Sequence, residues 1–73
     1  MIDITNETLV ALTEGKKLIP PPNSPTADQL HFWWDTGLVA ENGSRIFLET
    51  VKIGGRRYTS LQAFHRFVAA QNR

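Results

Sequence analysis

Apolar residues recur at helical spacing through the middle of this chain. Between Pro25 and Thr36, the residues Ala27, Leu30 and Trp34 fall on one helical stripe, with Trp33 at its edge. Ser24 before a proline is a typical N-cap arrangement. The pattern therefore predicts a helix over about residues 25–36.

The same spacing returns near the C-terminus, where Leu61, Phe64, Phe67 and Val68 mark one face of a helix. Thr59 or Ser60 can supply its N-cap, so we expect a helix over about residues 60–71.

A shorter helix is predicted over about residues 13–19, with Thr13 as its N-cap. Three consecutive prolines at residues 20–22 end it, because proline has no amide donor. Gly15 inside it is unfavourable by about 1 kcal/mol relative to alanine.

Between the last two helices, the run Ile46–Ile53 is rich in β-branched and apolar residues. Gly54 and Gly55 separate it from Arg56–Thr59, an arrangement typical of a tight hairpin over about residues 46–59. The order is helix, helix, β-hairpin, helix. We therefore expect one α+β, mainly helical domain over residues 1–73, in which residues 1–12 form a strand, a turn of helix or a dimer arm.

Composition narrows the class of protein. The 73 residues include 41% hydrophobic residues and no cysteine, which excludes a disulfide or a thiolate-bound zinc. No apolar run is long enough to span a bilayer. Asp3 and Glu7 stand where a signal peptide carries basic residues, so we expect a cytoplasmic protein without membrane contact.

Charge is divided unevenly along the chain. Residues 1–44 have a net charge of −4, whereas residues 45–73 have a net charge of +5. This division is compatible with one basic face that attracts phosphate, and equally with pairing between the two halves.

The chain also resembles the MerR/excisionase type of winged helix-turn-helix and, more narrowly, a family of short uncharacterised bacterial proteins. The resemblance extends over nearly the whole chain and is most specific at the junction of hairpin and last helix. It is carried by Leu12-Thr13-Glu14 and Leu18, by Ser24, Leu30, Trp33 and Gly37, and by Val51-Lys52-Ile53-Gly54-Gly55-Arg56-Arg57-Tyr58-Thr59-Ser60 with Phe64. It implies a small winged helix-turn-helix that binds double-stranded DNA as a transcriptional regulator or excision accessory factor.

The candidate DNA contacts lie on the hairpin and the second helix. Lys52, Arg56, Arg57 and Tyr58 surround the glycine turn, where cationic side chains can reach phosphate. Strand alternation places Arg56 and Arg57 on opposite faces, so one of them shares a face with Lys52.

On the second helix, Gln29 is a candidate for reading adenine and Thr26 for contacting phosphate or a thymine methyl. Asp28 and Asp35 on the same exposed face would repel phosphate. Phe32 lies off the core stripe, where it either packs beneath the proline segment or marks a protein contact.

No constellation of residues suggests catalysis, a metal or another cofactor, since His31 and His65 lack partners at ligand spacing. We therefore expect a DNA-binding module, not an enzyme, that acts as a homodimer or beside a partner protein. The alternative is a protein interaction adaptor that has lost DNA binding.

Overall fold

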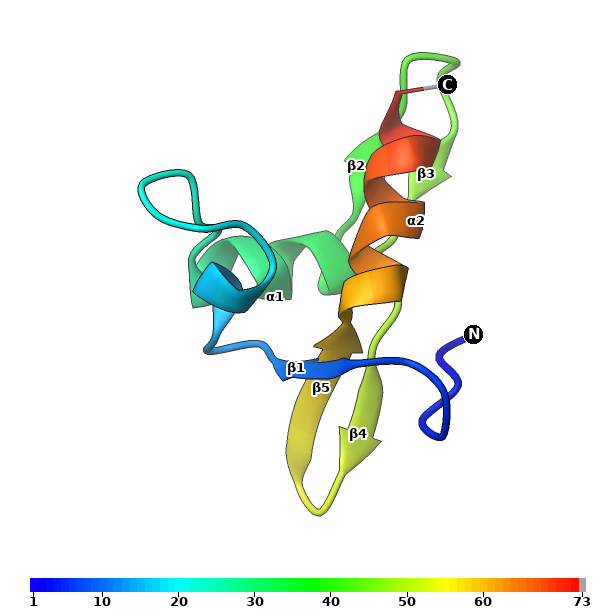
Figure 1. Ribbon diagram of the computed structural model, residues 1–73. Helices are drawn as coiled ribbons and strands as arrows, with labels where there is room; N and C mark the ends of the chain where they lie inside the picture. Colours follow the sequence, from blue (N-terminus) through cyan, green and yellow to red (C-terminus); the bar gives the residue numbers. More distant parts are fainter. Residues whose placement is uncertain (73) are drawn as a thin grey trace.

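The computed structural model describes residues 1–72, and Arg73, one of the basic residues counted above, lies outside this range. The described chain contains two α-helices, one 3₁₀ turn and five short strands (Figure 1). In chain order these are β1 (Leu9–Ala11), η1 (Gly15–Lys17), α1 (Ala27–Asp35), β2 (Leu38–Val39), β3 (Arg45–Ile46), β4 (Val51–Ile53), β5 (Arg56–Ser60) and α2 (Leu61–Gln71).

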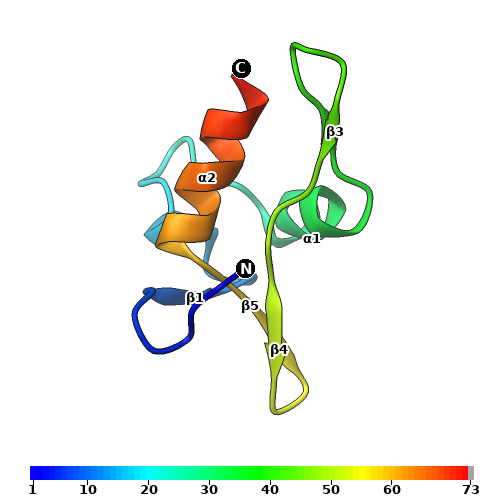
Figure 2. The ribbon, with the colours of Figure 1, turned by 90° about the vertical axis from the view of Figure 1, so that its right-hand side faces the viewer.

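The strands form two antiparallel sheets. The larger has the order β1-β5-β4, and the smaller pairs β2 with β3. The β4–β5 and β2–β3 hairpins extend toward opposite ends of the molecule (Figures 1 and 2). Gly54 and Gly55 form the turn of the former with φ of 57° and 83°. Two consecutive positive φ angles suit the right-handed twist of a two-residue hairpin, and glycine adopts them without strain.

Helix α2 continues directly from β5 and is also bonded to the segment that leads into β1, the neighbouring edge strand. The Ser60 hydroxyl accepts a bond from the Ala63 N–H at 2.8 Å and so caps the helix. The Leu61 N–H donates to the carbonyl of Thr8 at 2.9 Å, just before β1 begins. The sheet and α2 are therefore held as one unit.

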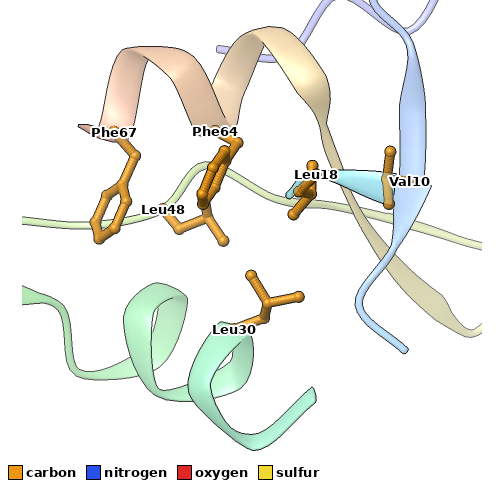
Figure 3. Close-up of a cluster of buried hydrophobic side chains, with 6 residues drawn as sticks. All are labelled: Val10, Leu18, Leu30, Leu48, Phe64 and Phe67. Carbon is orange, nitrogen blue, oxygen red and sulfur yellow. The ribbon is translucent and has the colours of Figure 1, made fainter. Parts of the chain in front are cut away.

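The hydrophobic core lies between α1, α2 and the sheet (Figure 3). Its buried side chains are Val10, Leu18, Leu30, Leu48, Phe64 and Phe67. Leu30 is 0% exposed and is the one residue that α1 buries completely. Trp33 adds to this core, since its ring centre lies 6.3 Å from that of Phe64 and 5.5 Å from that of Phe67.

The expectation of a mainly helical winged helix-turn-helix fold is wrong. Strands outnumber helices among the described residues, and the expected helix over residues 13–19 is reduced to the three residues of η1. Gly15 is buried there, and a side chain at this position would overlap the carbonyl oxygen of Pro25. A segment this short gains too few hydrogen bonds to offset the free-energy cost of helix nucleation, so the chain forms one 3₁₀ turn here. Only one α-helix, α1, therefore precedes the hairpins in the described chain.

Other boundaries also differ from those expected. The helix predicted over residues 25–36 begins at Ala27, because Thr26 and not Ser24 is its N-cap. The hairpin predicted over residues 46–59 is confined to Val51–Ser60, while Arg45 and Ile46 belong to a second hairpin. The final helix spans Leu61–Gln71 with Ser60 as its cap, close to prediction. Residues 9–11, left open between a strand, a helical turn and a dimer arm, form a strand.

Candidate nucleic-acid interface

The register of the β4–β5 hairpin divides its cations between two faces. Lys52 lies opposite Arg57, whereas Arg56 lies opposite Ile53. Directly opposed residues of an antiparallel pair point to the same side. Lys52 and Arg57 therefore share the face that also carries buried Thr59, which is the side of α1, and Arg56 points away from it.

Arg57 is fixed between the hairpin and α1. Its guanidinium carbon lies 3.9 Å from the centre of the Trp34 ring. Its Nη1 donates a hydrogen bond of 2.9 Å to the Thr50 hydroxyl. A guanidinium over an indole face is a favourable cation–π arrangement. The contact leaves other N–H donors of the same guanidinium for a ligand.

Trp34 is itself oriented by its own helix. Its indole N–H donates to Nδ1 of His31 at 3.3 Å, and the two rings meet edge to face. His31, Trp34 and Arg57 thus form a continuous row from α1 to the hairpin. This row brings the cationic face of the hairpin beside an exposed helix.

The two predicted base-reading residues of α1 are engaged in capping it. The Thr26 hydroxyl accepts the Gln29 N–H at 3.1 Å, and the Gln29 Oε1 accepts the Thr26 N–H at 2.9 Å. This reciprocal pair is a capping box. Both side chains are held at the helix start, while Asp28 and Asp35 are exposed on the same helix.

Tyr58 and Phe32 occupy different surroundings. Tyr58 is half-buried on the central strand, between Ala11 of β1 and Val51 of β4. It therefore lies on the face opposite Lys52 and Arg57. Phe32 on α1 is 49% exposed, so its side chain is not enclosed beneath the proline segment.

The basic residues fall into two electrostatic groups. Arg66 donates to Glu49 Oε2 at 2.9 Å and to Glu7 Oε1 at 3.1 Å, and both carboxylates raise the pKa of Arg66 above its usual range. In the described part of the chain, no acidic side chain forms a salt bridge with the hairpin cations Lys52, Arg56 and Arg57. The positive charge of the hairpin is therefore available to an anionic partner.

The carboxylate network beneath α2 is structural. The Ser60 hydroxyl donates to Glu7 Oε1 at 2.6 Å, and the Asp3 N–H donates to Glu7 Oε2 at 3.0 Å. These two bonds, with Arg66, lower the pKa of Glu7 to about 2. Bonding to Arg66 likewise lowers the pKa of Glu49. Glu7 of the acidic half and Glu49 of the basic half thus both pair with Arg66, and neither forms a salt bridge with the hairpin cations.

Sequence reasoning did not identify Trp34 or Thr50 as part of this site. Trp34 was expected in the core, and it does pack against the core cluster together with Trp33, but its contact with Arg57 was not foreseen. Arg45 was also missed; it donates to the carbonyl of Thr36 at 3.0 Å, at the end of α1. The T-x-x-Q spacing of Thr26 and Gln29 was a readable capping signal.

Within residues 1–72, no three histidine, aspartate or glutamate side chains are grouped closely enough to hold a metal ion. In the same range, neither helix has the length and apolar character required to cross a bilayer.

Residues 39–72, from the end of β2 through α2, match the family described as protein of unknown function (DUF1580). No curated protein and no solved structure matches the chain. The match supports the likeness to a short uncharacterised protein family over the segment that contains the hairpin cations and the Ser60 cap. It gives no support to the broader resemblance to MerR and excisionase proteins.

Proposed function

We propose that this protein binds double-stranded DNA through the sugar-phosphate backbone, using the β4–β5 hairpin as its main contact. The observation that carries the proposal is the position of Arg57, which is fixed on Trp34 so that the face of the hairpin with Arg57 and Lys52 lies beside the exposed helix α1. Charged guanidinium and ammonium groups supply most of the sequence-independent affinity for DNA.

Electrostatics support the same proposal. Lys52 and Arg56 are exposed, and Arg57 is half-exposed, on a ribbon of only three and five residues per strand. Their divergent directions allow the hairpin to contact phosphates on either side of its tip.

Helix α1 has a lesser part in this proposal. Thr26 and Gln29 are committed to the capping box, and Asp28 and Asp35 place negative charge on the exposed surface. Such a helix is poorly suited to bidentate reading of bases. We therefore propose binding with little sequence preference, in a regulatory or recombination complex whose other members supply specificity.

A binding titration of single charge variants tests the proposal. Fluorescence anisotropy of a labelled duplex is measured with wild type, Lys52→Ala, Arg56→Ala and the control Asn42→Asp. The control lowers net charge by one on the β2–β3 turn and retains the acceptor that Asn42 Oδ1 offers to the Ser44 N–H. Both hairpin variants should bind every duplex more weakly, and the control should not. Equal affinities for all four proteins would overturn the proposal.

A second candidate function is supported by exposed aromatic side chains. Phe32 is 49% exposed and Phe47 is 52% exposed, whereas aromatic side chains more often lie in cores or interfaces. These residues favour an adaptor that binds another protein. Sedimentation of the protein at increasing concentration tests self-association: Phe32→Ser and Phe47→Ser should each weaken any dimer, and a monomer at all concentrations would exclude a second copy as the partner.

A further inference from the structure

A surface hollow lies where β1 separates from β5. After Ala11 the chain turns away from the sheet toward η1 (Figure 1). The last contact between the two segments is a long hydrogen bond of 3.5 Å from the Leu12 N–H to the Arg57 carbonyl. The hollow at this point has a volume of about 410 Å³ and is lined by Ala11, Leu12, Thr13, Arg56 and Arg57.

The lining combines two kinds of chemistry. Arg56 supplies positive charge and N–H donors, and Thr13 supplies a hydroxyl, all of which suit a phosphate group. The guanidinium of Arg57 is held on Trp34 and Thr50. Ala11 and Leu12 supply an apolar surface beside them. The nearest acidic residue in sequence, Glu14, is bound to Lys17 at 2.7 Å, so its charge is largely compensated.

We infer that this hollow binds one sugar-phosphate unit, with the phosphate at Arg56 and Thr13 and the sugar against Ala11 and Leu12. The inference rests on the proposed DNA binding, because it assigns the unit to the duplex backbone. The same chemistry would recognise a free nucleotide. The position of the hollow beside the hairpin, and not within an enclosed cavity, favours a continuous strand that can pass over it.

Amide chemical shifts locate the ligand directly. The ¹⁵N-labelled protein is titrated with a short duplex and, separately, with a deoxynucleoside monophosphate. Shifts of the Leu12, Thr13 and Arg57 amides with the duplex are expected. Duplex binding that leaves these three amides unchanged would overturn the inference while leaving the proposed function intact. Shifts at these amides with the mononucleotide but not with the duplex would overturn the assignment to the DNA backbone.

A charge placed in the hollow gives an independent test. Thr13→Glu introduces a carboxylate into the hollow and should lower duplex affinity about tenfold, since a carboxylate beside a phosphate at an interface is strongly unfavourable. Thr5→Glu is the matched control, because exposed Thr5 lies before β1, at the opposite end of that strand from Thr13. Circular dichroism verifies that both variants are folded. Equal affinities for the two would overturn the hollow as a binding site, whereas Lys52→Ala, at a residue outside the hollow, separately tests the proposed function.

Discussion

Arg57 of the hairpin and Trp34 of α1 are in direct contact, with the guanidinium carbon 3.9 Å from the centre of the indole ring. The two residues are 23 positions apart in the chain, Trp34 in helix α1 and Arg57 in strand β5. Their contact joins the cationic ribbon to the helix, and it determines which surface the hairpin presents.

A double-mutant cycle of Trp34→Leu and Arg57→Ala should reveal this contact. We expect a coupling free energy of about 0.5–1 kcal/mol in urea unfolding, the usual range for a partly exposed cation–π pair. The bond from Arg57 to Thr50 is lost in both variants that lack Arg57, so it cancels in the cycle. Strict additivity of the two substitutions would show that the contact contributes nothing.

Leu30→Ala should destabilise the protein by about 2–5 kcal/mol, because it removes a completely buried side chain and leaves a cavity between α1 and α2. Phe32→Ala on the same helix provides the comparison, as its ring is half-exposed and should matter much less. Chemical denaturation measures both. Comparable losses would mean that Phe32 belongs to the core.

Thr26→Ala should reduce stability by about 1 kcal/mol, since the Gln29 N–H then loses its cap. Thr26→Ser retains the hydroxyl and should behave like wild type. Gln29→Ala should likewise affect stability without changing the preference among DNA sequences. A shift in preference at one base position, measured by competition among duplexes, would show instead that Gln29 reads a base.

The depressed pKa of Glu7 predicts an acid-dependent loss of stability. A carboxyl whose folded pKa lies below its unfolded value stabilises the fold above the unfolded pKa, and this contribution disappears as pH falls. With the pKa lowered from 4.5 to about 2, the loss should occur between these values.

Glu7→Gln should flatten the pH dependence of the free energy of unfolding over this range, which urea titrations at successive pH values would measure. Glu41→Gln, on the exposed β2–β3 turn, is the control and should retain the wild-type profile. An identical pH dependence in Glu7→Gln and wild type would show that Glu7 is not responsible.

Local signals predicted the elements with strong periodicity. The final helix was foreseen because Phe64 and Phe67 recur at helical spacing after a serine cap, and the glycine pair predicted the hairpin turn. The start of α1 was misplaced because Ser24 and Pro25 form a competing start signal two residues earlier. The hydroxyl oxygen of Ser24 is instead buried without a hydrogen-bond partner among the described residues.

The remaining errors depend on contacts distant in sequence. Strand β1 has no alternating pattern and exists because Val10 pairs with Thr59. The helix expected after it fails because Gly15 packs against Pro25. Both tryptophans pack against the core, but their further partners differ, since Trp33 lies against Phe67 of α2 while Trp34 contacts Arg57 of the hairpin. None of these contacts can be predicted from a short segment of the sequence.

The salt dependence of duplex binding tests the central claim most directly. If Lys52, Arg56 and Arg57 each neutralise one phosphate, log affinity should fall with log salt concentration with a slope of about −2.7. The double variant Lys52→Ala/Arg56→Ala should retain a slope of about −0.9, and Asn42→Asp should retain the full value. A slope that is the same in the double variant as in wild type, or no duplex binding at low salt, would contradict the proposal that the hairpin binds DNA.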